Sequence, residues 1–467
     1  MSSKEYCKSS AARGGLLYMR GVPGIALGDR VVVRDYKGRR RNGQVTRTSD
    51  ELVLIQVFEG TDDLDLERTW VRFLDEPVEI LLSPEILGRV FNGVGLPRDG
   101  RPPLVSGIKR NVNGTPVNPA ARAYPREFIQ TGISTIDGLN SLVRGQKLPI
   151  FSGSGLPHNR LAAQIVRQSK LIGEATKFAV VFAAMGVSYD DARFFQEDFA
   201  SSGVLGNVTM FINLADDPTI ERLILPRTAL TAAEYLAFDL DMHVLVVLTD
   251  MTHYAEALRE VATAKGDVPS RKGYPGYLYS DLAELYERAG RIKERHGSIT
   301  MVPVLSMPSD DITHPIPDLT GYITEGQIVL SRDLHNQGVY PPMNVPPSLS
   351  RLMKDGIGEG FTREDHPRVA SQLYASYARA LEVRNLASII GAEELTAADR
   401  RYLAFAEGFE KRFIGQGEDE ERAIIETLTI AWDLLSILPP DTLSRVREAD
   451  IAKFHHYEEG VMSEAAA

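Results

Sequence analysis

A series of apolar segments separated by helical stretches limits the possible folds of this chain more than any other feature of its sequence. Four segments, residues 178–184, 208–212, 243–248 and 299–305, are mostly apolar and show no regular alternation with polar residues. A strand of this kind is buried on both faces. Helices between such strands predict a mainly parallel sheet that is covered by helices. Ligands of these sheets bind beyond the carboxyl ends of the strands.

The helical stretches are predicted from polar and apolar spacing between the strands. We expect helices over residues 160–172, 189–201 and about 226–238. A further strand is expected around residues 148–151, followed directly by a glycine-rich turn. This order of strand, turn and helix repeats through the middle of the chain and defines an α/β domain.

The two ends of the chain have different patterns. Short stretches rich in Val, Ile and Phe between residues 14 and 75 predict a small β-barrel or sandwich. From about residue 363, apolar residues recur at intervals of three and four, which is typical of helices. We therefore predict three domains. They are a β-barrel domain with a flexible start (1–76), an α/β domain (77–362) and a C-terminal helical domain (363–467).

Composition excludes several classes of protein. The only cysteine is Cys7, which we expect to lie outside the folded part, so a disulfide scaffold is excluded. The longest apolar run, residues 178–187, is much shorter than the ~20 residues of a spanning helix, so we expect membrane association only through a partner. The net charge of −11 gives no general attraction to nucleic acid. The short cluster Arg39–Arg41 is interpreted as a solvated hairpin turn.

Residues 152–159, with the sequence SGSGLPHN, occupy the place of a phosphate-binding loop, between a strand and a helix. A working loop has the form G-x-x-x-x-G-K-[ST], in which the lysine reaches the phosphates and the hydroxyl binds Mg²⁺. Here Ser152, Pro157, His158 and Asn159 replace the two glycines, the lysine and the hydroxyl residue. Pro157 also removes one backbone donor. We predict poor binding of Mg·nucleotide, while some anion affinity at the helix N-terminus remains open. The candidate nucleotide-contacting residues of this degenerate loop are Ser152, Gly153, Ser154, Gly155 and Asn159.

The chain also lacks an evident residue to activate a water molecule for ATP hydrolysis. The strand at 178–184 is followed by no carboxylate until Asp190. Asp250 does follow an apolar strand, where it either handles Mg²⁺ through water or only caps the next helix. We find neither a set of metal ligands among the histidines nor a catalytic nucleophile set.

Several long segments of the chain resemble the B subunit of rotary V/A-type ATPases. They are residues 128–134 (FIQTGIS), 142–152 (LVRGQKLPIFS) and 313–327 (THPIPDLTGYITEGQ). Residues 347–353 (PSLSRLM) are similar to that family's version of the rotary ATPase signature. The resemblance runs from about residue 14 to 456. It implies an N-terminal β-barrel, a central P-loop-type nucleotide-binding domain with a mainly parallel sheet, and a C-terminal helical bundle.

The same resemblance implies a non-catalytic, regulatory subunit. Three copies would alternate with three catalytic A subunits in a hexameric ring, with ATP or ADP at the A–B interface and Mg²⁺ held mainly by the A subunit. The ring would contact central and peripheral stalk subunits on the cytoplasmic face of a membrane. ATP synthesis or hydrolysis in the ring would be coupled to proton or sodium transport. No nucleic-acid partner is expected. The alternatives are an autonomous P-loop-type ATPase with a divergent loop, and a stand-alone nucleotide-binding or assembly module.

Arg351 is the candidate catalytic residue, acting in trans. The resemblance implies that it projects into the ATP site of the neighbouring A subunit, where a guanidinium can stabilise transition-state charge. The residues alone allow another interpretation, in which Ser348 caps a helix and Arg351 binds the nearby Asp355. The acidic pair Asp310–Asp311 resembles part of the loop that approaches the central stalk, and a solvated acidic loop is the alternative.

Overall fold

The computed structural model describes residues 4–7, 9–49, 51–171 and 177–456, and the chain divides into two compact units. The first unit comprises Met1–Ala123, Lys177–Met307 and Asp311–Ile323. The second unit comprises Tyr124–Thr176, Pro308–Asp310 and Thr324–Ala467.

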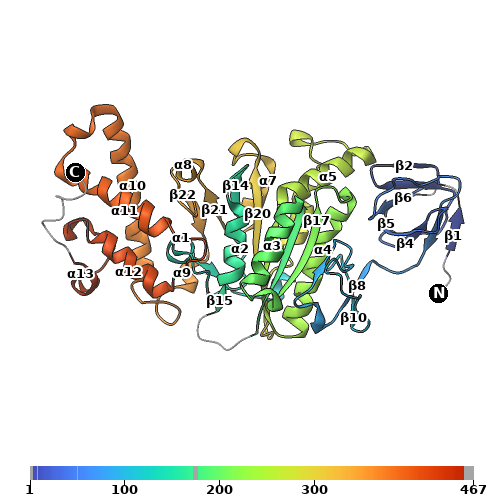
Figure 1. Cartoon of the computed structure of the whole chain (residues 1–467), viewed down its shortest axis with the longest axis horizontal. Helices are drawn as coiled ribbons and strands as arrows, with labels where there is room; N and C mark the ends of the chain where they lie inside the picture. The colour runs from blue at the N-terminus through green and yellow to red at the C-terminus, as the bar shows by residue number, and fades with distance from the viewer. Residues whose placement is uncertain (1–3, 8, 50, 172–176, 457–467) are drawn as a thin grey trace. The chain divides into compact units, whose positions relative to one another are not determined.

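The first unit begins with a seven-stranded antiparallel sheet, drawn in blue in Figure 1, with the strand order β1-β7-β4-β5-β6-β3-β2. Cys7 lies in its first strand opposite Trp70, so the expectation that Cys7 lies outside the folded part is wrong. Residues 1–3 and 8 of the expected flexible start are outside the described residues. The strands are β1 (Lys4–Cys7), β2 (Ala11–Arg13), β3 (Leu16–Arg20), β4 (Arg30–Arg34), β5 (Arg40–Thr48), β6 (Leu52–Val57) and β7 (Trp70–Phe73).

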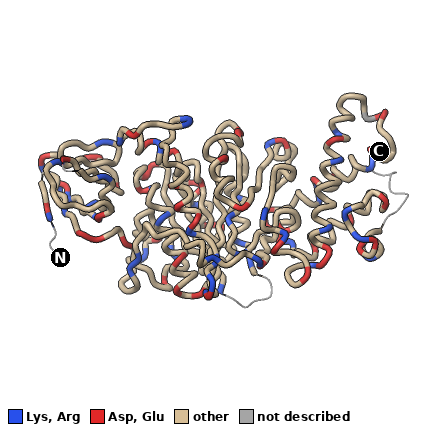
Figure 2. Tube along the Cα trace, turned by 180° about the vertical axis from the view of Figure 1, so that it is seen from behind, with Lys and Arg blue, Asp and Glu red and all other residues tan. Residues whose placement is uncertain are grey.

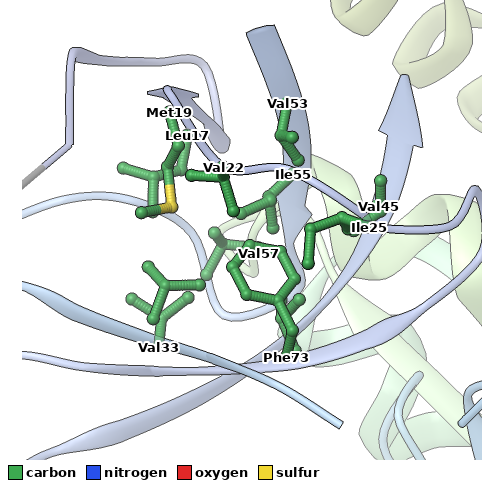
Figure 3. Packing of buried hydrophobic residues seen from close by; sticks show 12 residues of the cluster. Leu17, Met19, Val22, Ile25, Val33, Val45, Val53, Ile55, Val57 and Phe73 are labelled. Atoms are coloured by element: carbon green, nitrogen blue, oxygen red, sulfur yellow. The ribbon is translucent and has the colours of Figure 1, made fainter. Parts of the chain in front are cut away.

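Alternation of buried and exposed residues explains why this sheet has an interior. In β4, Val31 and Val33 are buried while the residues on either side of each are more exposed. Figure 3 shows the side chains of twelve such residues gathered between the strands, among them Val45, Ile55 and Phe73. Full burial of each such side chain contributes about 1.5–3 kcal/mol. This core is why the strands form despite their short length.

The arginine cluster at the β4–β5 hairpin has structural partners. The Arg39 guanidinium lies 2.6 Å from the Asp35 carboxylate, which also accepts two backbone N–H groups of the turn. Arg41 is buried and donates to the carbonyl groups of Gly60 and Asp62. Arg39 and Arg41 therefore stabilise the turn and the end of β5.

The first unit also contains five parallel strands in the order β20-β18-β16-β17-β9. The four mostly apolar segments of the sequence lie in the long strands of this set, and almost all of their residues are buried. This agrees with the prediction of a parallel sheet that is covered on both faces. The strands are β9 (Val90–Phe91), β16 (Phe178–Val187), β17 (Val208–Leu214), β18 (His243–Thr249) and β20 (Ser298–Met307).

The helices of the first unit follow these strands, as the sequence predicts. The helix predicted over 189–201 has these same bounds, because Ser188 accepts the Asp191 N–H and caps it. The helix expected from about 226 begins seven residues earlier, at Thr219, and Pro226 lies inside it. Burial of almost every face of this helix outweighs the local disadvantage of an internal proline. The helices are α3 (Tyr189–Ser201), α4 (Thr219–Glu234), α5 (Met251–Lys265), α6 (Leu278–Tyr286) and α7 (Pro315–Ile323). The smaller strand pairs are β8 (Glu79–Leu82) with β10 (Ile108–Asn111), and β11 (Arg122–Ala123) with β19 (Gly290–Ile292).

The second unit carries the glycine-rich segment on its own strands. In it, β14 (Ile150–Gly153) pairs in parallel with β21 (Gly326–Leu330), which pairs in antiparallel fashion with β22 (Met343–Ser350). A small antiparallel sheet consists of β13 (Leu142–Val143), β12 (Phe128–Gln130) and β15 (Lys170–Leu171), in that order.

The helix predicted over 160–172 is correct in its middle and wrong at its end. It runs over His158–Gln168, because Lys170 and Leu171 pair with Gln130 and Ile129 in place of continuing the helix. Residue 172 lies outside the described residues.

The remainder of the second unit is mostly helical, as predicted from residue 363 onward. The residues at the predicted spacing, such as Phe405, Phe409 and Phe413, are buried and stacked on one another. The helices of the unit are α1 (Ser134–Leu139), α2 (His158–Gln168), α8 (Arg332–Asn336), α9 (Met353–Gly356), α10 (His366–Ile390), α11 (Ala397–Gly408), α12 (Ile424–Leu435) and α13 (Glu448–Phe454).

Charged residues of both signs are interspersed along the whole trace in Figure 2. Within the described residues, no helix has both the length and the apolar composition that crossing a membrane requires.

Candidate functional site

The glycine-rich segment forms the strand–loop–helix arrangement of a phosphate-binding loop. Ser152 and Gly153 end β14 and are buried, Ser154 and Gly155 are exposed at the turn, and Asn159 lies in the first turn of α2. The structure thus brings all five candidate residues of the sequence analysis into one local element of the second unit.

Two backbone donors of this loop are used within the loop itself. The Leu156 N–H donates to the Gly153 carbonyl at 3.1 Å, and the His158 N–H donates to the Leu156 carbonyl at 2.8 Å. Pro157, between them, has no N–H. A working loop turns successive N–H groups toward the phosphates. Donors that already bond loop carbonyls are lost to a phosphate, so this loop is poorly built to hold one.

Two of the side chains that replace the phosphate-binding residues contact each other. Nδ1 of His158 lies 3.0 Å from Oγ of Ser152, within hydrogen-bond distance. His158 therefore bonds across the base of the loop, where a lysine would extend toward the phosphates. This contact joins two of the four substituted positions to each other.

An ion pair that the sequence analysis missed lies against this loop. Arg332, the first residue of α8, donates to both oxygens of Asp310, at 2.6 and 2.9 Å, and to the Ser154 carbonyl at 2.9 Å. A Cβ atom at Gly153 would lie 2.0 Å from the Asp310 Oδ1 atom, so the carboxylate packs directly on the glycine. Hydrogen bonding to Arg332 holds the pKa of Asp310 below its ordinary value.

The position of Asp310 bears directly on nucleotide binding. The Asp310 carboxylate occupies the space beside Gly153, and the Arg332 guanidinium is already bonded to Asp310 and to the Ser154 carbonyl. The residues present therefore fit Mg·nucleotide poorly, since the loop lacks the lysine and the Mg²⁺-binding hydroxyl and has the Asp310–Arg332 ion pair packed on its glycine. No local sequence signal links Asp310 to residues 152–159, because the contact joins distant segments.

The two adjacent acids of the predicted stalk loop are each paired with a cation. In the first unit, Asp311 lies 3.1 Å from the Lys272 amino group and accepts the Thr313 hydroxyl and N–H. These hydrogen bonds lower the pKa of Asp311 to about 2. Both acids are therefore partly neutralised, which weakens the attraction of basic stalk residues that the sequence suggested.

Asp250 has the bonds of a structural helix cap. Its buried carboxylate accepts the Thr252 N–H at 2.7 Å at the start of α5. It also accepts the N–H and the hydroxyl of Ser306. Of the two interpretations in the sequence analysis, these contacts support the structural one.

Arg351 follows the last residue of β22 and is exposed. Its N–H donates to the Glu325 carbonyl at 3.0 Å, and its Nη1 donates to the Thr324 carbonyl at 3.1 Å. Exposure leaves the guanidinium accessible to another molecule. The structure thus carries a permanent positive charge on a short turn beyond an edge strand.

The structure contradicts one part of the local alternative for Arg351, the helix cap by Ser348. Ser348 lies within β22, where it accepts the Val329 N–H and donates to the Asn344 carbonyl, so it caps no helix. The Asp355 carboxylate accepts the Tyr124 hydroxyl at 2.9 Å, and this hydrogen bond raises the pKa of Tyr124. The expected Ser348 cap is wrong because the antiparallel pairing with β21 continues through Ser350.

No group of three His, Cys, Asp or Glu side chains that could hold a metal ion occurs within the described ranges.

In the first unit, a cavity of about 810 Å³ lies between the seven-stranded sheet and helices α4, α5 and α6. Its lining includes Phe58, Arg227 and Tyr254, and it lies in a different unit from the glycine-rich loop.

Family models match three successive parts of the chain. Residues 10–75 match the beta-barrel domain of the ATP synthase alpha/beta family, and residues 132–350 match that family's nucleotide-binding domain. Residues 355–455 match the C-terminal domain of V and A type ATP synthase. These matches confirm the predicted fold class of β-barrel, P-loop-type α/β domain and helical domain.

Similar proteins cover nearly the whole chain. The V-type ATP synthase beta chain of Nitrosococcus oceani is 78% identical over 98% of this chain and 96% of its own length. The B subunit of the A-type ATP synthase of Aeropyrum pernix is 59% identical over 97% of this chain and 98% of its own length. The solved structure of the ATP synthase subunit NeqB from Nanoarcheaum equitans is 40% identical, with a TM-score of 0.72, and covers 90% of this chain and 98% of that one. This chain therefore belongs to the ATP synthase alpha/beta family, among the B subunits, or beta chains, of V-type and A-type ATP synthases.

Proposed function

We propose that this chain is the non-catalytic, regulatory B subunit of a V/A-type ATP synthase and that it supplies Arg351 to the ATP site of a neighbouring A subunit. Three copies alternate with three A subunits in a ring. ATP or ADP binds at the A–B interface, with Mg²⁺ held mainly by the A subunit. The ring contacts central and peripheral stalk subunits on the cytoplasmic face of the membrane. ATP synthesis or hydrolysis in the ring is coupled to proton or sodium transport.

The observation that carries this proposal is the contrast between the loop and the arginine. The loop bonds two of its own backbone donors and packs Asp310 on Gly153, which disfavours hydrolysis by this chain alone. Arg351, by contrast, is exposed, and its Nη1 donates to the Thr324 carbonyl. A chain that cannot hold the phosphates well but presents a guanidinium is suited to act at another subunit's nucleotide.

The chemistry of Arg351 in this role is electrostatic. A guanidinium is always charged, and its planar array of donors matches phosphate oxygens. When a neighbouring subunit delivers it to a transferring phosphoryl group, the rate rises by about 10³–10⁵. Turnover then depends on a closed A–B interface, which makes the B subunit regulatory without a reaction of its own.

Replacement of Arg351 in a reconstituted ring tests this role. We expect Arg351→Ala to leave ring assembly intact and to lower kcat for ATP by about 10³-fold or more. Arg351→Lys should restore only part of the rate, because an ammonium lacks the planar donor array. Arg295→Ala is the matched control, since Arg295 is also exposed and donates to a carbonyl, that of Phe238.

Two results would reject the proposal. One is turnover within a few-fold of wild type in a fully assembled Arg351→Ala ring. The other is ATP hydrolysis by the purified chain alone at the rate of the ring, which would support the autonomous ATPase.

A further inference from the structure

We infer that Gln146, Lys147 and Glu325 form a largely buried brace that sets the position of Arg351. The inference deepens the proposed function, because it rests on the role of Arg351 at the neighbouring ATP site. The three residues are positioning residues, and we name them the Arg351 brace. All of them lie in the second unit, together with Arg351.

Arg351 is attached at two points to the same dipeptide. Its backbone N–H bonds the Glu325 carbonyl, and its guanidinium bonds the Thr324 carbonyl. The backbone and the charged end of the arginine therefore both rest on residues 324–325. Any displacement of this dipeptide moves the guanidinium with it.

Glu325 is itself fixed to Lys147 through three contacts. The Glu325 N–H donates to the Lys147 carbonyl at 3.0 Å, and the Lys147 N–H donates to Oε2 of Glu325 at 2.8 Å. The Lys147 amino group lies 2.8 Å from Oε1 of the same carboxylate. The side chains are 3% and 29% exposed, so the pair is largely shielded from solvent.

Gln146 joins the two chain segments that meet at Arg351. Its side-chain amide donates to the Glu325 carbonyl at 3.1 Å and to Oγ of Ser350 at 2.9 Å. Its own oxygen accepts the Val143 N–H at 2.9 Å, and the residue is completely buried. Ser350 directly precedes Arg351 and pairs with Gly326 across the ladder. Gln146 therefore holds the turn from both sides.

The physical purpose of such a brace is precision. Fully hydrogen-bonded buried groups resist displacement, because moving one of them leaves another unsatisfied. A charged group that acts on a reacting phosphoryl must be placed accurately, and an error of about 1 Å can lower the rate by about 10²-fold. The brace holds the turn in place and leaves the guanidinium exposed.

Rings assembled from wild-type A subunits and variant B subunits test the inference. We expect Glu325→Gln and Gln146→Leu each to lower kcat by about 10²-fold while the KM for ATP stays unchanged, since the A subunit still binds the nucleotide. Each variant combined with Arg351→Ala should be no slower than Arg351→Ala alone, because the brace acts only through Arg351. Gln146→Leu removes no charge, so it tests the inference even where Glu325→Gln destabilises the fold.

Glu127→Gln is the matched control. Glu127 forms an ion pair with Arg144 that has similar burial, with side chains 33% and 6% exposed, at the ends of β12 and β13. We expect this variant to lower stability and to leave kcat unchanged. A merely structural role for the brace would give the same result for all three variants.

Three outcomes would overturn the inference. The first is wild-type kcat for both brace variants in rings where Arg351→Ala abolishes turnover, which would leave the proposed function standing. The second is an equal loss of kcat in Glu127→Gln. The third is normal turnover in Arg351→Ala, which would reject the proposed function together with the brace.

Discussion

Replacement of His366 by glutamine should make the second unit less sensitive to acid. His366 begins α10 and is completely buried. Its Nε2 lies 3.1 Å from the Gly138 carbonyl, which can only accept, so Nε2 carries the proton. Its Nδ1 lies 3.0 Å from Oγ1 of Thr362, whose hydroxyl therefore donates to the neutral ring. Both bonds are satisfied without a positive charge.

Burial lowers the pKa of His366 from 6.5 to about 4. Between these two values the unfolded chain binds the proton that the folded chain excludes, so stability falls as the pH falls below 6.5. The whole difference, at about 1.4 kcal/mol for each pH unit, corresponds to about 3 kcal/mol, and most of it is lost by pH 4.5. Burial raises the pKa of Asp137, in the same unit, to about 7, so its contribution to stability has the opposite pH dependence. Asp137 is present both in the protein with His366 and in His366→Gln, so its contribution cancels when the two are compared.

Urea denaturation at several pH values measures this difference. Trp432 reports on the same region, since its indole N–H donates to Asp365, the neighbour of His366. The chain has two tryptophans, so Trp70→Phe leaves Trp432 as the only one. Between pH 7.5 and 4.5, we expect the protein with His366 to lose about 2–3 kcal/mol more than His366→Gln. Parallel loss of stability in the two proteins would refute the reasoning.

Two further changes give testable results. Restoring the motif through Ser152→Gly, Pro157→Gly, His158→Lys and Asn159→Thr should give the isolated chain measurable affinity for Mg·ADP by calorimetry, because lysine and hydroxyl are then both present. The same variant with His158 retained should bind much more weakly, and equal binding would contradict the assigned role of the lysine. Arg288→Met should lower the free energy of unfolding by about 3 kcal/mol, since Glu234 loses both hydrogen bonds of a guanidinium that is 1% exposed. If denaturant titrations show a loss of unfolding free energy below about 1 kcal/mol, the Arg288–Glu234 pair contributes no more than an ordinary surface ion pair, and the prediction is wrong.

Local sequence patterns predicted the elements whose causes are local. The apolar runs became buried parallel strands, and Ser188 capped a helix where the sequence indicated one. The failures came from distant contacts. Burial of α4 overrides Pro226, and strand pairing with residues 129–130 ends α2 at Gln168.

The candidate site divides in the same way. The missing lysine and hydroxyl at positions 158 and 159 are visible in the motif itself. The packing of Asp310 on Gly153 is not visible there, because the two residues meet only in the folded unit. The contacts of Arg351 with residues 324–325 are hidden for the same reason, although both segments stand out in the sequence.

Calorimetric titration of the assembled ring with Mg·ADP tests the central claim most directly. If the B subunit holds no nucleotide of its own, three sites per ring should be found, and the isolated chain should give none. Six sites per ring, or one site on the isolated chain that depends on residues 152–159, would contradict the account.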